Sequence, residues 1–461
     1  MSEGRRISLH GEWSSSLIFV LAAAGSAVGL GNLWRFPYLV GENGGAAFII
    51  VYLACILLVG LPIMVAEITL GRRGRASPIN SLRRVARDEA RAEGWSLVGW
   101  LGVAAGFLIL SFYSVVGGWS LYYVLQAGLG SFGGITAERS GELFEGLVGS
   151  PGAVLVWHTV FMLILFWIVA AGVRRGLQRA VKLLMPVLFA LLLGLVLYGM
   201  RTPGFGEAMD FLLQPDFAAL APGAMLAALG QAFFTLSLGM GAIMVYGAYL
   251  PSRSSIAGTA GWVVGLDTLT ALLAGLAIFP VVFTVGLEPA EGAGLVFVTL
   301  PVVFGDIAFG WLVGLVFFAL LSVAAVTSGM SLLEPAVSYL AETWRGSRIQ
   351  AAAVITLLIW LLGIACGLSL NAWSGVELLP GMGIMDSVEY VSSNLMLPLG
   401  GLLVAIFLTW RVRAESVADE LDCSHRGALF VTWHFILSYI APAAVIVILV
   451  EASGLLALVA G

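Results

Sequence analysis

The chain has little charge for its length, and this excludes most soluble folds. Asp, Glu, Lys and Arg make up 11% of its 461 residues, whereas a soluble domain carries roughly 25%. The mean hydropathy is +1.01. Apolar runs of about 20 residues, the length of a membrane-spanning helix, recur along the sequence. We therefore expect a polytopic, all-α membrane protein.

Cysteine and histidine are also scarce. The three cysteines, Cys55, Cys366 and Cys423, are too scattered for a disulfide framework or a metal site. With four histidines and no His/Cys cluster, the sequence offers neither a transition-metal site nor a nucleophile–base constellation, so we do not expect an enzyme. The polar residues 1–16 run into the first apolar stretch without a small-residue cleavage site, and no cleavable signal peptide is expected.

Eleven apolar stretches predict eleven spans. They lie near 14–37, 44–71, 96–127, 152–172, 176–199, 224–249, 258–286, 307–341, 350–368, 388–411 and 428–451. Arginines gather in alternate connections, most densely between residues 72 and 91. Because basic residues favour the cytoplasmic side, this asymmetry predicts a cytoplasmic amino terminus, and the odd number of spans predicts an external carboxyl terminus.

The first span contains a sequence that should break its helix. Residues 25–37 read Gly-Ser-Ala-Val-Gly-Leu-Gly-Asn-Leu-Trp-Arg-Phe-Pro, with three glycines, an asparagine, an arginine and a proline. In hydrocarbon a broken helix is tolerated only where the freed backbone groups find protein, water or ions. The freed carbonyls are therefore candidate ligands.

A second such sequence interrupts the sixth span. Residues 235–241 read Thr-Leu-Ser-Leu-Gly-Met-Gly, five spans after the first break. Spans five apart cross in opposite directions, as an inverted repeat of spans 1–5 and 6–10 requires, and paired broken helices indicate a transporter's binding site. Glycines can also serve close helix packing, but polar residues at both breaks favour a site. The predicted units are 1–13 (cytoplasmic), 14–200 (first repeat), 224–411 (second repeat) and 428–451 (last helix).

Polar residues in other spans complete the candidate ligand set. Asp267 lies in the middle of the seventh span, where a carboxylate is a cation ligand or a structural charge partner. Thr327 and Ser328 place two adjacent hydroxyls in the eighth span, although such hydroxyls often bond to the preceding helical turn. Hard oxygen ligands of this kind suit sodium.

These motifs match a known family. They are Gly25–Pro37, Glu42-Asn-Gly-Gly45, Gly230-Gln-Ala-Phe-Phe-Thr-Leu-Ser-Leu-Gly-Met-Gly241 and Thr327-Ser328. Over essentially its whole length the chain resembles the neurotransmitter:sodium symporters, specifically the bacterial eleven-helix amino-acid transporters. The resemblance implies sodium-coupled import of a neutral amino acid by alternating access across a bacterial plasma membrane.

The resemblance also implies two sodium sites and a substrate pocket. The first site would use the Ala27 carbonyl, Asn32, Thr235 and Asp267, completed by the substrate carboxylate. The second would use the carbonyls of Gly25, Val28 and Ala324 with the hydroxyls of Thr327 and Ser328. The pocket would be lined by Ser26, Leu30, Gly31, Ile109, Tyr113, Phe234, Ser237, Met240, Ser328 and Leu332, with Tyr113 and the amides of Leu30 and Gly31 facing the carboxylate.

Two features bear on the substrate and on chloride. Monoamine-transporting relatives carry an Asp at the position of Gly29, so its absence favours an amino acid, and the apolar wall implies a branched or aromatic one. Another small zwitterion is the alternative. Asp267 stands where many relatives have Asn, and its fixed charge predicts that chloride is not required. An ion channel is the second functional hypothesis, although a doubly broken, gated core argues against it.

The resemblance also implies an outer and an inner gate. Arg35 would close the outer side with Glu389, and Asp386 is the competing acid. Tyr249 and Glu342 match the inner gate, but His10 stands where the family usually has Arg, so its role stays open, as does substitution by Arg5 or Arg6. The spacing of Gly176 and Pro186 matches a segment whose unwinding would admit water to the second sodium site, or it is only a packing kink. We expect a monomer to suffice for transport, and no nucleic-acid partner.

Overall fold

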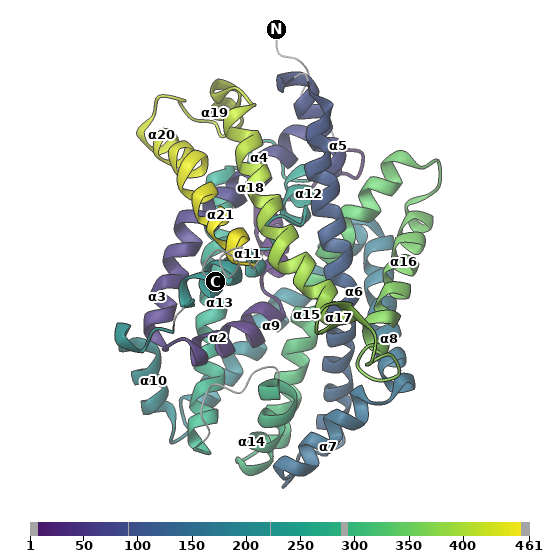
Figure 1. Cartoon of the computed structure of the whole chain (residues 1–461), viewed down its shortest axis with the longest axis vertical. Helices are drawn as coiled ribbons and strands as arrows, with labels where there is room; N and C mark the ends of the chain where they lie inside the picture. Colours follow the sequence, from purple (N-terminus) through teal and green to yellow (C-terminus); the bar gives the residue numbers. More distant parts are fainter. Residues whose placement is uncertain (1–7, 91, 222, 287–293, 453–461) are drawn as a thin grey trace.

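A computed structural model describes residues 8–90, 92–221, 223–286 and 294–452, and these are overwhelmingly helical. Within them nine helices are long and apolar enough to cross a bilayer, and a bent pair forms a tenth candidate span. Most of these helices run along the long axis of the molecule (Figure 1). The expected polytopic, all-α architecture is therefore confirmed.

The first half of the chain carries the spans predicted before residue 200. Its helices are α1 (Ser16–Ala27), η1 (Gly31–Arg35), α2 (Phe36–Glu42), α3 (Ala46–Cys55), η2 (Ile56–Gly60), α4 (Leu61–Gly74), α5 (Pro78–Val85), η3 (Ala86–Ala90), η4 (Glu93–Trp95), α6 (Ser96–Gly128), α7 (Ala137–Val148), α8 (Pro151–Ala170), η5 (Val173–Leu177) and α9 (Gln178–Gly199). The segment from Gly176 to Pro186 is wound here, so its unwinding remains a prediction.

The second half contains the remaining spans and one small hairpin. Its helices are α10 (Phe205–Leu213), η6 (Phe217–Ala219), α11 (Ala224–Thr235), α12 (Ala242–Ala248), α13 (Ile256–Thr284), η7 (Leu295–Thr299), α14 (Leu300–Asp306), α15 (Gly310–Thr343), α16 (Arg348–Leu368), α17 (Ile384–Glu389), η8 (Tyr390–Met396), α18 (Leu397–Trp410), α19 (Ala414–Glu420), α20 (Ala428–Phe435), η9 (Ile436–Ile440) and α21 (Ala441–Ala452). The strands β1 (Glu377–Leu379) and β2 (Met382–Gly383) pair antiparallel.

Both predicted breaks are present. α1 ends at Ala27, and a second helical segment begins at Gly31. The two segments are bent by 54° relative to one another. The sixth predicted span is two helices, α11 and α12, separated by residues 236–241, and neither half is long enough to count as a span by itself. Because of this division, length and composition alone give fewer spans in the described residues than the eleven predicted, and the count of eleven remains a prediction.

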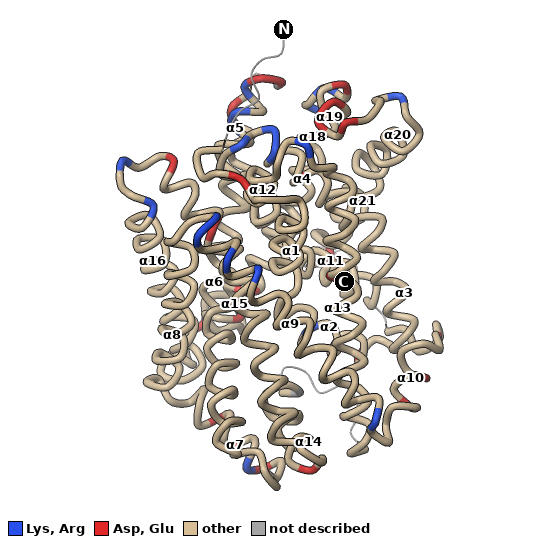
Figure 2. Tube along the Cα trace, turned by 180° about the vertical axis from the view of Figure 1, so that it is seen from behind, with Lys and Arg blue, Asp and Glu red and all other residues tan. Residues whose placement is uncertain are grey.

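Charged residues are densest at one end of the molecule. Figure 2 shows basic residues at mid-height of the bundle and a few charged residues near α7 and α10, but the largest group, of both signs, lies around α5 and α19. There Glu89 forms ion pairs with Arg73 and Arg413. Burial opposes ionisation of Glu89, but hydrogen bonds from Arg413 and Ser416 and the charge of Arg73 outweigh it, so the pKa of Glu89 lies below its ordinary value.

Candidate substrate and sodium site

A cavity lies where the two breaks meet. Twelve residues line it, and they include all ten that were predicted to form the pocket. They are Ser26, Ala27, Gly29, Leu30, Gly31, Ile109, Tyr113, Phe234, Ser237, Met240, Ser328 and Leu332. They come from the first break, the second break, α6 and α15, so helices distant in sequence build one small-molecule pocket.

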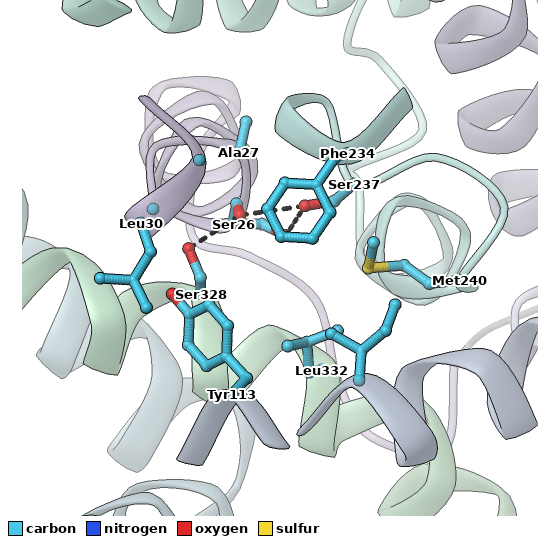
Figure 3. A pocket seen from close by; sticks show the side chains of 12 residues that line it. Ser26, Ala27, Leu30, Tyr113, Phe234, Ser237, Met240, Ser328 and Leu332 are labelled. Atoms are coloured by element: carbon cyan, nitrogen blue, oxygen red, sulfur yellow. Dashed lines mark hydrogen bonds between the residues drawn. The ribbon is translucent and has the colours of Figure 1, made fainter. Parts of the chain in front are cut away.

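The two ends of the cavity differ in chemistry. Tyr113 and Leu30 lie at one end, and Met240 and Leu332 at the other (Figure 3). Within the described residues the buried Tyr113 hydroxyl makes no hydrogen bond of ordinary geometry, although the Leu30 backbone and Ser328 lie close to it. A buried hydroxyl normally has a partner, so this orphan group points to a ligand with an acceptor.

Gly29 keeps the polar end open. A Cβ at this position would lie 2.4 Å from Ser328 Oγ and 3.2 Å from the Tyr113 hydroxyl oxygen. The first separation is too short for any side chain without displacement of Ser328. The glycine therefore preserves the space in front of Tyr113.

The backbone at the second break has an unusual conformation. Ser237 has φ +54°, in the left-handed region that non-glycine residues rarely adopt. The buried Glu67 on α4 accepts a hydrogen bond from Gly239 N at 2.7 Å. A Cβ on Gly239 would lie 2.2 Å from the Leu397 carbonyl oxygen, so only glycine fits. Strain of this kind persists where surrounding contacts maintain it, and it is common at functional sites.

Three side chains predicted for the first sodium site form one buried cluster. Asn32 Nδ2 donates to Asp267 Oδ1 at 2.8 Å, and Thr235 Oγ1 donates to the same oxygen at 2.9 Å. Among the described residues Asp267 Oδ2 makes no hydrogen bond of ordinary geometry, although the Tyr52 hydroxyl faces the same carboxylate. An unpaired buried carboxylate oxygen is costly, and a bound cation would remove that cost. Ala27, the fourth predicted residue, lines the adjoining cavity.

The oxygens predicted for the second sodium site also converge. Ser328 Oγ lies 3.3 Å from the Gly25 carbonyl oxygen and 3.4 Å from that of Val28. Thr327 Oγ1 lies 2.9 Å from the Ala324 carbonyl oxygen, as expected for a helical hydroxyl. Neutral oxygens of two helices therefore face one another, which is the donor set that a hard monovalent cation prefers.

The predicted outer pair is not in contact. No ion pair within 4 Å joins Arg35 to Glu389 or to Asp386 in the described part of the chain, and both acids are exposed. The Arg35 guanidinium instead lies 5.2 Å from the centre of the Phe234 ring, over the cavity. The direct Arg35–Glu389 ion pair expected from the sequence is therefore not formed here, although Arg35 is half-buried and the two charges lie near enough to interact.

His10 and Glu342, two of the residues predicted for the inner gate, are in contact. His10 Nε2 lies 3.0 Å from Glu342 Oε1, and Glu342 also accepts hydrogen bonds from the Ser77 amide and hydroxyl and from Asn80. Tyr249, the third residue predicted for the inner gate, donates to Glu334 Oε1 at 2.7 Å, and its ring centre lies 5.9 Å from that of His10. Arg5 and Arg6, the alternatives to His10, lie outside the described residues.

One partner was missed by the sequence reasoning. Arg348, at the start of α16, forms an ion pair with the buried Glu334 on α15, and the sequence analysis did not predict this pair. The same guanidinium lies 3.4 Å from His10 Nδ1. The two residues are 14 positions apart and are separated by a helix end and a turn. The one signal in the sequence is Arg348 itself, a basic residue a few positions after the predicted eighth span.

Comparison with known proteins shows which family the chain belongs to. Residues 10–131 and 143–456 match the sodium:neurotransmitter symporter family. The chain belongs to that family. It is 40% identical over 447 residues to a sodium-dependent transporter of Bacillus subtilis, covering 96% of this chain and 98% of the relative. It is 34% identical to a sodium-dependent transporter of Haemophilus influenzae, covering 95% and 97%.

A solved structure extends the likeness to three dimensions. The chain matches MhsT in complex with L-phenylalanine with a TM-score of 0.88 and 45% identity, covering 96% of this chain and 99% of that one. The resemblance drawn from the motifs is thereby confirmed. The protein is a polytopic membrane transporter of a sodium-dependent family, and members of that family are transporters rather than enzymes.

Proposed function

We propose that the protein imports neutral hydrophobic L-amino acids, branched or aromatic, together with sodium, across a bacterial plasma membrane. The observation that carries this proposal is the cavity at the two breaks, with a free tyrosine hydroxyl at one end and an apolar wall at the other. A zwitterion with an apolar side chain complements both ends. The structural neighbour MhsT binds L-phenylalanine, which is such a molecule.

Two sodium ions would accompany the substrate. The cluster of Asn32, Thr235 and Asp267 adjoins the polar end of the cavity, so a substrate carboxylate could complete its ligand set. Ion and amino acid would then bind with a positive coupling free energy, which by linkage acts equally in both directions. The Asp267 carboxylate brings a fixed negative charge, so we infer that chloride is not needed.

The two gates support alternating access. The contacts of His10 with Glu342 and of Tyr249 with Glu334 are formed, while Arg35 and Glu389 stand apart. We infer that this conformation is closed to the cytoplasm and accessible from outside. The proposed architecture is eleven spans in a five-plus-five inverted repeat, with the amino terminus in the cytoplasm, and with one monomer sufficient for transport.

A binding screen tests the proposal. The purified full chain is heated with each of the twenty amino acids, with sodium and with potassium in its place. A ligand that binds only the folded protein raises the melting temperature. We expect stabilisation by leucine, isoleucine, valine or aromatic amino acids in sodium only. Stabilisation by none of the twenty, or by all equally, would contradict the assignment of the pocket.

A further inference from the structure

The pocket contains four side-chain hydroxyls, and three of them already donate to the protein. Ser237 Oγ and Ser328 Oγ each donate to the Ser26 carbonyl oxygen at 3.0 Å. Ser26 Oγ donates to Ser331 Oγ at 2.7 Å. Since a hydroxyl carries one proton, these three serines have no donor left for a substrate. The fourth hydroxyl is that of Tyr113, which is unpartnered among the described residues.

Ser331 decides the direction of the Ser26 hydroxyl. It lies on α15, is 1% exposed and does not line the cavity. Its own proton goes to the Ser328 carbonyl oxygen at 2.7 Å, so its oxygen is left to accept. The alternative acceptor for Ser26 is Ser237 Oγ, at the longer distance of 3.2 Å.

This arrangement bears on side-chain selectivity. A polar substrate side chain loses its hydrogen bonds to water when it enters the pocket, and it is rejected unless the pocket returns a partner. Ser26 lies between the polar and the apolar end (Figure 3). With its proton committed to Ser331, it cannot donate to such a side chain.

We propose that Ser331 is a specificity-determining residue outside the pocket. By accepting the Ser26 proton, it keeps the substrate's side-chain site free of hydrogen-bond donors and so favours apolar over polar amino acids. The inference rests on the proposed function, since it assumes that this cavity holds an amino acid.

Valine and threonine provide the test, because their side chains differ mainly in replacing a methyl group by a hydroxyl. The Kd of each is measured on the purified full chain by competition against labelled L-phenylalanine in saturating sodium. In Ser331→Ala the Ser26 proton loses its nearest acceptor and becomes available to a substrate hydroxyl, with only the longer contact to Ser237 Oγ at 3.2 Å competing for it. We expect the ratio of threonine to valine affinity to rise two- to tenfold, the effect of one net hydrogen bond.

Two further variants separate specificity from structure. Ser322→Ala removes a hydroxyl on the same helix that bonds to Ser120 at 3.0 Å, away from the cavity, and should leave the ratio unchanged. Ser26→Ala combined with Ser331→Ala removes the released donor and should return the ratio to the wild-type value. If Ser331→Ala does not fold, Ser331→Cys, with its weaker acceptor, should move the ratio in the same direction by less.

The outcomes are distinguishable. An unchanged ratio in Ser331→Ala, or an equal loss of affinity for valine and threonine, would overturn the role of Ser331 and leave the proposed function intact. Failure of the wild-type chain to bind any amino acid would instead overturn the proposed function itself.

Discussion

Replacement of Tyr113 by phenylalanine removes one oxygen atom from the pocket and tests how the substrate carboxylate is recognised. Among the described residues the hydroxyl makes no internal hydrogen bond of ordinary geometry, so its loss should cost the folded state little. The folded state should therefore be no less stable than wild type. A hydrogen bond to a charged group contributes about 1.5–3 kcal/mol, and its loss should weaken amino-acid binding roughly 10- to 150-fold.

The assay is equilibrium binding of labelled L-phenylalanine to the purified variant in sodium, with the melting temperature recorded on the same sample. Tyr246→Phe is the matched control, because Tyr246 is also buried with an unpartnered hydroxyl but does not line the cavity. It should bind like wild type. Unchanged affinity in Tyr113→Phe, or equal losses in both variants, would refute recognition of the carboxylate by Tyr113.

Three other predictions concern the pocket, the inner gate and the charged end. Gly29→Ala should lose amino-acid binding at least tenfold in the same assay, because its Cβ would lie 2.4 Å from Ser328 Oγ; normal affinity would show that this space is not used. His10→Ala removes the contact of His10 Nε2 with Glu342 Oε1, which should destabilise the inward-closed conformation and reduce sodium-driven uptake; uptake equal to wild type would contradict a role in the inner gate. Folding lowers the pKa of Glu89, so the stabilising effect of this carboxylate is complete above the ordinary pKa of 4.5 and is lost as the pH falls through the lowered pKa. The Glu89→Gln variant should therefore have a lower melting temperature than wild type at neutral pH. The difference between the two melting temperatures should shrink in acid.

Local sequence identified the features whose cause is local. Three glycines and a proline cannot continue an apolar helix, so the break after Ala27 was predictable from residues 25–37 alone. A carboxylate such as Asp267 in mid-span requires a partner, and the structure places Asn32 and Thr235 against it.

Contacts between helices far apart in the sequence were harder to predict. The pairing of Glu334 with Arg348 depends on how α16 turns back against α15, and no periodicity in either segment encodes that turn. Ser331 is one serine in an apolar run, and its neighbour Ser26 becomes visible only when α1 packs on α15. The separation of Arg35 and Glu389 belongs to one conformation of a moving protein, whereas a sequence carries the contacts of all its conformations at once.

Uptake into proteoliposomes tests the central claim most directly. The full chain is reconstituted, and accumulation of labelled L-phenylalanine is followed with an inward sodium gradient, with potassium replacing sodium, and with gluconate replacing chloride. Sodium-coupled symport predicts saturable accumulation above equilibrium in sodium, equal in chloride and gluconate, and none in potassium. Accumulation that is the same without sodium, or that stops at equilibrium in a full sodium gradient, would contradict it.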